Sequence, residues 1–356
     1  MTGNGRSTAD GVAPAVPEDR VEGLAALLDA FDLAARVVLT THVNADGDGA
    51  GSEAALAAWL AQRGTSVAIV NPTPFPDDFR FLLEDEGVVA NANSEDGLRA
   101  LEEAELVVVL DTAEPDRIGK VARRIDGKRL GILDHHPPGE AGLEGVGVVA
   151  PEASATGELL FDLLAHAQAT GRSVDWSRGV REGIYAAILT DTGSFRFANT
   201  GPRTHAIAAF LLDAGVDPEH LYREIYATAS VARLQLLQEA LARLETDPEL
   251  PITWISIPDE VIRRLGVAPA DFEPVTEHAR MVKGTEVAIL FREVADGSTK
   301  ISLRSNGRAD VNGIARELGG GGHTKAAGAV IGAPLEEARE RVLTAVRAAV
   351  RELPEA

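Results

Sequence analysis

The chain has 356 residues, which is enough for two domains of typical size. Apolar residues make up 45% and charged residues 25% of it, which excludes a disordered or collagen-like chain. It contains no cysteine, so disulfides and thiolate-bound metals are excluded. With 55 acidic and 34 basic residues the net charge is −21, so general attraction to long duplex nucleic acid or to an anionic membrane is not expected.

The N-terminal residues 1–19 are rich in glycine, alanine and proline, and we expect them to form a disordered tail. They contain no apolar run of the kind found in signal peptides, and the chain has no uninterrupted apolar run of about 18 residues. These features favour a cytoplasmic location without a membrane partner.

From residue 21 to residue 151, short β-branched runs alternate with longer amphipathic stretches, a pattern typical of parallel α/β sheets. We therefore predict a doubly wound α/β domain over residues 20–198. Its predicted strands cover residues 36–42, 67–71, 105–111, 129–134 and 145–151, with predicted helices over 49–64 and 94–103 between them.

The later part of the chain first becomes helical and then returns to strands. Alanine- and leucine-rich stretches bounded by proline or glycine predict helices over 156–170, 176–189, 202–214, 218–227 and 231–245. We expect residues 199–248 to form a helical linker and residues 249–356 to form a smaller α+β domain. In that domain the predicted strands are 252–257, 286–294, 300–305 and 326–331, and the predicted helices are 311–318 and 335–352.

Acidic and histidine residues follow three predicted strands and one predicted helix. They are His42, Asp46 and Asp48 at the first strand, Asp111 at the third, Asp134, His135 and His136 at the fourth, and Asp191 after the helix over 176–189. Because ligands bind beyond the carboxyl ends of the strands in an open α/β sheet, we expect these residues to converge on one crevice. A single aspartate there is usually a turn residue or a helix cap. A converging set of carboxylates, however, would repel one another unless cations lay between them.

The donor types in this set indicate which metals to expect. Carboxylate oxygens and imidazole nitrogens without sulfur suit Mn²⁺ or Mg²⁺, while Fe²⁺, Co²⁺ and Zn²⁺ are also accepted by such sites. The set is large enough for two ions joined by a bridging carboxylate, an arrangement that many phosphatases and nucleases use. Two such ions lower the pKa of a bound water toward neutrality, so attack on phosphorus requires no serine or cysteine nucleophile.

Four segments resemble the four motifs of the DHH phosphoesterase family. They are Thr40-Thr-His-Val-Asn-Ala-Asp-Gly-Asp48, Asp111-Thr112, Leu133-Asp-His-His-Pro137 and Asp191-Thr-Gly-Ser-Phe195. Two later segments, Leu303-Arg-Ser305 and Gly320-Gly-Gly-His-Thr-Lys-Ala-Ala-Gly328, resemble the DHH-associated C-terminal domain. The segments follow the family's order and extend over nearly the whole chain after the tail. Ala45 stands where a proline is common in the family, which is expected to change the rigidity of the loop and not metal ligation.

The resemblance implies a role for each of these residues. One divalent cation would be held by His42, Asp46 and Asp111, and a second by Asp48, Asp111, His135 and Asp191, so that Asp111 bridges the two. Mn²⁺ is the expected metal, with Mg²⁺ and others as alternatives. His136 would act as a catalytic residue facing the scissile phosphate, and Asp134 would orient a neighbouring group. The substrate would be bound by Arg304, Ser305, Gly320, Gly321, Gly322 and His323.

The predicted C-terminal domain differs in charge from the rest of the chain. Between residues 276 and 330 there are eight arginines or lysines and six acids, which predicts that this domain holds an anionic substrate. Aromatic residues make up 4% of the chain, too few for a long channel lined by stacking side chains. We therefore expect a short RNA or a nucleotide as substrate, held in a cleft between the domains, and no long duplex.

Within the family, the resemblance implies an enzyme that degrades very short RNA to mononucleotides and removes phosphate from 3′-phosphoadenosine 5′-phosphate. Hydrolysis of cyclic di-AMP is the main alternative. A RecJ-like single-strand exonuclease is more remote, because the chain has no room for an additional nucleic-acid-binding domain. A catalytically silent nucleotide-binding protein is also more remote, because the set of metal ligands is complete. The resemblance further implies a homodimer.

Overall fold

The computed structural model describes residues 13–139 and 142–353. The chain divides into two compact units, with the boundary between Thr228 and Ala229. Helices α6 (Pro202–Asp213) and α7 (Pro218–Tyr226) belong to the first unit, and helix α8 (Val231–Leu241) belongs to the second. The segment 199–248, which the sequence predicts to be a linker, is therefore divided between the two units.

The first unit is built on a parallel sheet of six strands in the order β3-β2-β1-β4-β5-β6. The strands are β1 (Arg36–Thr40), β2 (Ser66–Asn71), β3 (Val89–Asn91), β4 (Leu106–Leu110), β5 (Leu130–Asp134) and β6 (Val146–Val149). The sheet grows in one direction from β1 to β3 and in the other from β4 to β6, so its topological switch point lies between β1 and β4. The predicted doubly wound sheet is confirmed, although the three-residue strand β3 was not predicted.

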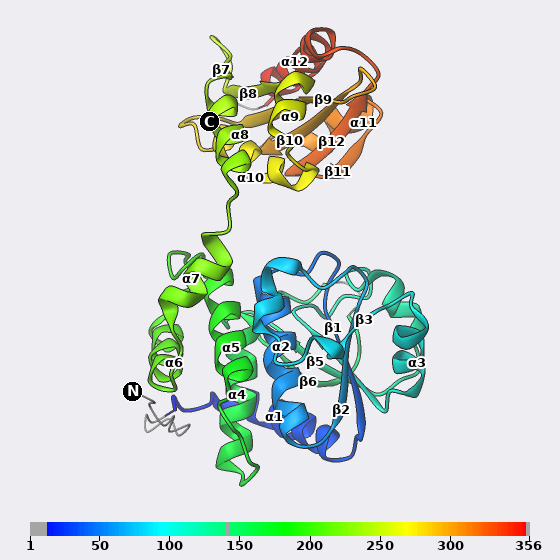
Figure 1. Ribbon diagram of the computed structural model, residues 1–356, viewed down its shortest axis with the longest axis vertical. Helices are drawn as coiled ribbons and strands as arrows, with labels where there is room; N and C mark the ends of the chain where they lie inside the picture. Colours follow the sequence, from blue (N-terminus) through cyan, green and yellow to red (C-terminus); the bar gives the residue numbers. More distant parts are fainter. Residues whose placement is uncertain (1–12, 140–141, 354–356) are drawn as a thin grey trace. The chain divides into compact units, whose positions relative to one another are not determined.

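Helices cover both faces of this sheet (Figure 1). One face packs against α1 (Glu18–Asp32), α2 (Gly47–Gln62) and α4 (Thr156–Ala169), and α5 (Arg178–Asp191) packs on α2 and α4. The other face packs against α3 (Glu95–Glu103) and the short 3₁₀ helix η3 (Gly119–Arg124). Two further 3₁₀ helices, η1 (Asp77–Leu82) and η2 (Glu86–Val88), lie between β2 and β3 in the chain.

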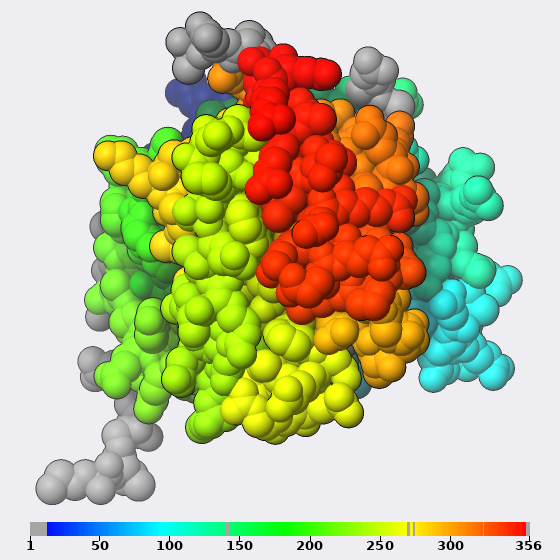
Figure 2. Space-filling view, turned by 90° about the horizontal axis from the view of Figure 1, so that it is seen from above, coloured from blue at the N-terminus to red at the C-terminus, as the bar shows by residue number. Residues whose placement is uncertain are grey.

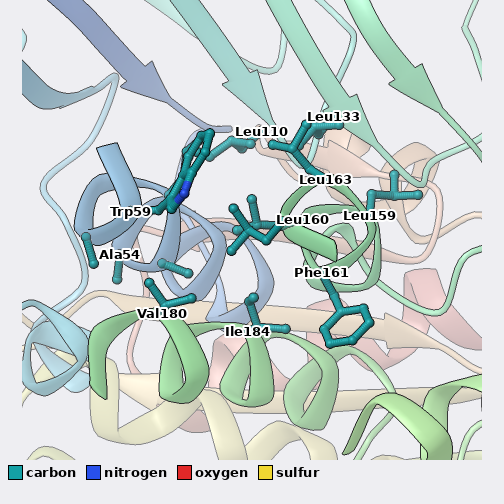
Figure 3. Packing of buried hydrophobic residues seen from close by; sticks show 14 of the residues in the cluster. Ala54, Trp59, Leu110, Leu133, Leu159, Leu160, Phe161, Leu163, Val180 and Ile184 are labelled. Carbon is teal, nitrogen blue, oxygen red and sulfur yellow. The ribbon is translucent and has the colours of Figure 1, made fainter. Parts of the chain in front are cut away.

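The larger core of the first unit lies between the sheet and helices α2 and α4. Figure 3 shows Trp59 of α2 and Leu160 of α4 near Leu110 and Leu133 of the sheet, and all four side chains are fully buried. Burial of such large apolar side chains stabilises the fold by about 1.5–3 kcal/mol each. The core therefore holds the strand ends in fixed positions relative to the first residues of both helices.

The start of helix α1 differs from the sequence prediction of a tail over residues 1–19. The helix begins at Glu18, and Ala13 and Val16 pack against the core. Residues 13–19 are therefore part of the first unit, and the rest of the expected tail, residues 1–12, lies outside the described residues.

The second unit contains a mixed sheet of six strands in the order β11-β12-β10-β9-β8-β7, with β8 and β9 parallel and the other pairs antiparallel. The strands are β7 (Leu244–Thr246), β8 (Ile252–Ile257), β9 (Val287–Glu293), β10 (Thr299–Ser305), β11 (Gly321–His323) and β12 (Ala326–Ile331). The predicted α+β class is confirmed. Strands β7 and β11 were not predicted, and the predicted helix over 231–245 ends earlier, at Leu241.

Helices cover both faces of the second sheet as well. One face packs against α8, α9 (Asp259–Leu265), the 3₁₀ helix η4 (Pro269–Phe272) and α10 (Glu273–Arg280). The other packs against α11 (Val311–Glu317) and α12 (Leu335–Arg351), and Figure 2 shows α12, in red, on the surface of this unit. No helix in the described ranges of either unit is long and apolar enough to span a lipid bilayer.

Helices α2 and α5 touch along their backbones at two glycines, Gly51 and Gly183. A Cβ atom added at Gly183 would lie 2.6 Å from the carbonyl oxygen of Gly51, and one added at Gly51 would lie 2.5 Å from the carbonyl oxygen of Gly183. Such an approach requires residues without a side chain. Because α2 begins beside Asp46 and α5 ends at Asp191, the glycine contact fixes the distance between two segments that carry predicted metal ligands.

Replacing Gly183 with valine should lower the free energy of unfolding by at least about 2 kcal/mol, because the new side chain collides with the backbone of α2. Gly201→Val is the matched control, since Gly201 has an extended backbone with nothing within 4 Å of an added Cβ, and its expected loss is below about 1 kcal/mol. Urea unfolding followed by tryptophan fluorescence measures both effects in a Trp254→Phe background, in which Trp59 and Trp176 of the first unit are the remaining tryptophans. Equal losses in the two variants would contradict the close backbone contact.

Candidate metal centre

The acidic and histidine residues singled out in the sequence come together at one edge of the parallel sheet. Strands β1, β4 and β5 are neighbours, and their carboxyl ends lead into His42, Asp111 and His135. These ends lie at the topological switch point, where doubly wound sheets bind their ligands. Asp191 is the last residue of α5, and its Oδ2 lies 3.6 Å from Nε2 of His135. The structure thus joins residues from four separate parts of the chain in one site.

Asp111 lies at the centre of this arrangement. Its Oδ2 is 3.2 Å from Nε2 of His42, and its Oδ1 is 3.5 Å from Nε2 of His135. The first histidine also faces Asp46, at 3.8 Å from Oδ1, and the second faces Asp48, at 3.4 Å from Oδ2. One carboxylate therefore offers an oxygen to each of two histidine–carboxylate clusters.

Three groups of side chains in the described ranges have ligand atoms that all lie within 4.8 Å of one another. They are His42 with Asp46 and Asp111, Asp48 with His135 and Asp191, and Asp111 with His135 and His136. The first two groups match the two ligand sets that the family resemblance implies, apart from the second contact of Asp111. Asp134 belongs to none of the three groups.

The ring of His42 is oriented as a metal ligand requires. Nδ1 of His42 lies 3.0 Å from the carbonyl oxygen of Val43 and donates to it, so Nε2 is the ring atom that would ligate a metal once its own proton is lost. The Nε2 atoms of His42 and His135 are both buried, and neither has a well-directed hydrogen-bond partner among the described residues. A buried nitrogen lone pair surrounded by carboxylate oxygens is suited to a divalent cation.

The carboxylates carry more negative charge than their surroundings can stabilise. Burial raises the pKa of Asp48 well above its usual range, and the charges of Asp111 and Asp191 raise it further. Burial also raises the pKa of Asp191. Burial acts in the same sense on Asp111, but the facing His135 and His42 outweigh it and hold its pKa below the usual range. This excess of charge, together with the unpartnered nitrogens, fits the binding of divalent cations.

The N-terminus of helix α4 orients two of these carboxylates. Oδ2 of Asp48 accepts from the backbone N–H of Thr156 at 2.7 Å, and Oδ1 accepts from that of Gly157 at 2.9 Å. The hydroxyl of Thr156 donates to Oδ1 of Asp111 at 3.0 Å. The positive end of the helix dipole therefore partly offsets the charge of both carboxylates and fixes their direction.

Asp46 has a structural role in addition to its predicted role as a ligand. It is the N-cap of α2, where its Oδ1 accepts from the backbone N–H groups of Asp48 at 3.0 Å and of Gly49 at 3.2 Å. A helix cap is the common role of an aspartate at this position. Here the cap also holds the carboxylate in place beside His42.

The backbone is strained at the same place. Four non-glycine residues in the described ranges have positive φ: Asn44 (56°), Asp111 (62°), Ser194 (61°) and Phe195 (63°). All four lie in the loops or at the strand end that carry the predicted ligands. Each such conformation costs about 1 kcal/mol or more and is typically kept where function requires it. Aspartate tolerates the left-handed region better than most residues, which suits the position of Asp111.

His136 lies next to this cluster and is held by Asp134. Oδ1 of Asp134 accepts from Nδ1 of His136 at 2.8 Å and from its backbone N–H at 3.0 Å. The ring is partly exposed, and its Nδ1 lies 3.7 Å from Oδ1 of Asp111. These hydrogen bonds hold the ring of His136 beside Asp134, while the orienting role of Asp134 and the catalytic role of His136 stay predictions.

The predicted substrate-binding residues of the second unit lie at β10 and β11. Arg304 is half-buried on β10, and Ser305 is buried at the end of the same strand. A Cβ atom at Gly320 would lie 2.1 Å from the carbonyl oxygen of Gly328, so this glycine is required by close packing against β12. Close packing against β12 also requires a glycine at position 322, whereas nothing in the packing requires one at Gly321. The side chain of His323 is not among those that the structure describes. Their role toward a substrate stays a prediction.

The sequence interpretation missed a buried pair behind the metal centre, Asn71 and Glu53. Oδ1 of Asn71 accepts from the backbone N–H of Thr41, the residue before His42, at 3.0 Å. Its Nδ2 donates to Oε2 of Glu53 at 2.8 Å. Burial raises the pKa of Glu53 to about 8, although the Asn71 contact opposes this. The position of Asn71 at the end of a predicted strand was a signal for this role.

Asn199 is a second residue that was missed. Its Nδ2 lies 3.3 Å from Oδ2 of Asp191 and 2.9 Å from the carbonyl oxygen of Ser154, to both of which it donates. It thereby ties the end of α5 to the segment before α4. No pattern in the sequence marks this residue, because it lies in an irregular turn.

Comparison with known proteins shows to which family the chain belongs. Residues 36–188 match the N-terminal domain of the DHH family, and residues 261–352 match the DHHA1 domain. The bifunctional oligoribonuclease and PAP phosphatase NrnA of Thermus thermophilus is 32% identical over 313 residues, which are 87% of this chain and 89% of that protein. The chain belongs to the DHH phosphoesterase family. It is therefore a phosphoesterase, a class of hydrolase, and members of this family use divalent metals.

Two further DHH relatives are informative. The crystal structure of an exopolyphosphatase-related protein from Bacteroides fragilis has a TM-score of 0.79 and 26% identity, covering 96% of this chain and 98% of that one. The cyclic-di-AMP phosphodiesterase GdpP of Geobacillus thermodenitrificans is 27% identical over 266 residues, which are 71% of this chain and 37% of that protein. The chain therefore matches the oligoribonuclease over most of both proteins, but matches the cyclic-di-AMP phosphodiesterase over a minor part of the latter.

Binding of a divalent cation at pH 7 should release protons. The carboxylates of Asp111 and Asp46 outweigh the effect of burial and raise the pKa of His42 to about 10 in the metal-free protein. A protonated imidazole cannot be a ligand, so this proton leaves on binding and metal affinity rises with pH up to about 10. Calorimetric titration with Mn²⁺ in buffers of different ionisation enthalpy counts the protons. His42→Ala should release roughly one fewer, whereas equal release would contradict ligation by His42.

Asn71→Leu should weaken Mn²⁺ binding by about 10–100-fold, because the segment that leads into His42 loses its buried hydrogen bond. Asn93→Leu is the matched control, since Asn93 is exposed and the change in affinity should be negligible. The same calorimetric titration gives both affinities, and circular dichroism checks that each variant is folded. Unchanged affinity in Asn71→Leu would exclude a positioning role for this residue.

Proposed function

We propose that this protein is a two-metal phosphoesterase that hydrolyses short oligoribonucleotides to mononucleotides and removes phosphate from 3′-phosphoadenosine 5′-phosphate. The observation that carries the proposal is the shared position of Asp111, which faces both His42 and His135. A bridging carboxylate between two ligand sets is the arrangement of two-metal phosphoester hydrolysis. The activity for which the Thermus thermophilus relative is named supports the choice of substrate, because that relative matches over most of both chains.

Each predicted ligand and catalytic residue of the metal centre has a defined role in this proposal. His42 and Asp46 with Asp111 would hold one divalent cation, and Asp48, His135 and Asp191 with Asp111 would hold the other. When bound, such ions, preferably Mn²⁺, would stabilise negative charge on the phosphoryl group and lower the pKa of bound water. His136, oriented by Asp134, faces the substrate and donates a proton to the leaving oxygen.

The second unit binds the nucleotide end of the substrate. Arg304 supplies a positive charge at β10, Ser305 follows it, and the glycine-rich strand β11 leads into His323. Guanidinium groups bind phosphate oxygens through paired N–H donors. The low aromatic content of the chain supports a short substrate over a long single strand.

A second candidate function is hydrolysis of cyclic di-AMP. It is supported by the match to the Geobacillus thermodenitrificans phosphodiesterase, which covers 71% of this chain. The match covers 37% of that protein, so we rank this activity second.

A substrate panel tests the proposal. Purified protein with Mn²⁺ is given labelled RNA of two to five nucleotides, 3′-phosphoadenosine 5′-phosphate, cyclic di-AMP and pyrophosphate, and products are separated by chromatography. We expect the highest kcat/KM for short RNA and for 3′-phosphoadenosine 5′-phosphate. A preference for cyclic di-AMP would replace the first candidate by the second.

Asp111→Asn should reduce hydrolysis of every substrate in the panel by at least about 10³-fold, because the bridging carboxylate is lost while the left-handed backbone is retained. Asp116→Asn is the matched control, since Asp116 is exposed a few residues further along the same loop. Retained activity of Asp111→Asn with normal metal content would discard the two-metal assignment.

A further inference from the structure

A cavity in the second unit is lined by three cationic side chains. Its volume is about 140 Å³, and its lining residues come from η4, α10 and the strands β9 and β10. Arg292 comes from β9, and Lys300 and Arg304 come from β10. Arg304 is already assigned to substrate binding above, whereas the other two cations have no role in the proposed function.

The cations share a face of the sheet because side chains alternate along a strand. Lys300, Ser302 and Arg304 line the cavity, while the intervening Ile301 and Leu303 are buried in the core on the opposite face. At 3.4 Å per residue, Lys300 and Arg304 lie about 14 Å apart along β10. The polar face of this strand is therefore long enough for more than one phosphate group.

Two like charges face each other at the Arg292 end of the cavity. Arg292 and Lys300 are direct partners across the antiparallel pair of β9 and β10, a position in which like charges destabilise a sheet. None of the ion pairs among the side chains that the structure describes, which do not include that of Glu273, involves Arg292 or Lys300. At the other end, by contrast, Nε of Arg304 lies 3.7 Å from Oε1 of Glu277. An anion between Arg292 and Lys300 would turn this repulsion into attraction.

The guanidinium of Arg292 is prepared for such an anion. Its central carbon lies 4.8 Å from the ring centroid of Phe272, so the group stacks on the aromatic face. Stacking uses the face of the guanidinium and leaves its N–H edges available to an acceptor. Burial lowers the pKa of Arg292, which indicates that its charge is partly removed from water. The hydroxyl of Ser302 adds a further donor to the same cavity.

We propose that the Arg292–Lys300 end of this cavity binds a phosphate group. The forked guanidinium, the ammonium and the hydroxyl suit a tetrahedral oxyanion with several acceptor oxygens. The group belongs either to an oligonucleotide whose other phosphate lies at Arg304 or to a free phosphate or mononucleotide. The first source rests on the proposed function, because it requires an oligonucleotide substrate, and the second does not.

Kinetics of Lys300→Gln and Arg292→Gln test the first source in the full-length, Mn²⁺-loaded protein. For each variant, kcat/KM is measured with RNA of two and of four nucleotides, and the ratio of the two values is compared with that of the wild type. We expect the ratio of kcat/KM for four nucleotides to that for two to fall at least fivefold, because KM for the longer RNA rises. The kcat/KM of the variants for the longer RNA should also depend less on salt concentration than that of the wild type. Lys283→Gln, which removes an exposed lysine outside the cavity, should keep the wild-type ratio.

Binding of inorganic phosphate tests the second source. The ³¹P line width of phosphate is measured with Mg²⁺-loaded, full-length wild type and with the same three variants, so that any phosphate at the metal centre contributes equally to all. Reduced broadening in Lys300→Gln and Arg292→Gln, but not in Lys283→Gln, would assign the cavity to free phosphate.

The kinetic measurement tests the oligonucleotide and the line-width measurement tests free phosphate, so a negative result in one does not decide the other. The proposal is overturned if Lys300→Gln and Arg292→Gln match Lys283→Gln in both the kinetic ratio and the phosphate line width. If the wild type hydrolyses no RNA, the proposed function fails, and the phosphate measurement alone then decides whether the cavity binds this group.

Discussion

Crowding of negative charge in a buried space is the constraint on which the site depends. Asp48 and Asp111 are almost fully buried, and Asp191 lies beside the same histidine. In a medium of low dielectric constant such carboxylates repel strongly and lose their hydration. The protein offsets part of this cost with the N-terminus of α4 and with two histidines. Nε2 of His42 and Nε2 of His135 have no well-directed hydrogen-bond partner among the described residues. Divalent cations would complete the balance of charge in this arrangement.

The parallel sheet makes this crowding possible. Adjacent strands lie about 4.8 Å apart, so residues that are distant in the sequence become neighbours where their strands end. His42, Asp111 and His135 meet in this way at the switch point of the sheet. The strained backbone at Asp111 is held by the strands and helices around it, since a loop without such support would relax to an ordinary conformation.

Sequence patterns predicted the parts of this protein that depend on local chemistry. The long strands and helices have clear periodicity, and the ligands follow strands whose apolar composition indicates burial, so both the doubly wound sheet and the convergence of the acidic residues could be foreseen. The short strands β3 and β7 could not, because strands of three residues form through pairing with a neighbour and not through their own propensity. Asn71, Glu53 and Asn199 were missed because their contacts join distant parts of the chain.

The glycine contact between α2 and α5 has a consequence for how this enzyme can evolve. Asp46 and Asp191 lie at the ends of helices α2 and α5, whose backbones are in direct contact. No side chain lies between the two backbones at this contact that could change rotamer when the distance between the helices changes. Elsewhere in a core, a larger side chain can be accommodated when its neighbours repack. At Gly51 or Gly183, a larger side chain would push the two helices apart. It would change the positions of the metal ligands at the helix ends and lower the stability of the fold. Substitutions that raise thermal stability by enlarging core residues are therefore excluded at this helix contact and must occur elsewhere in the molecule.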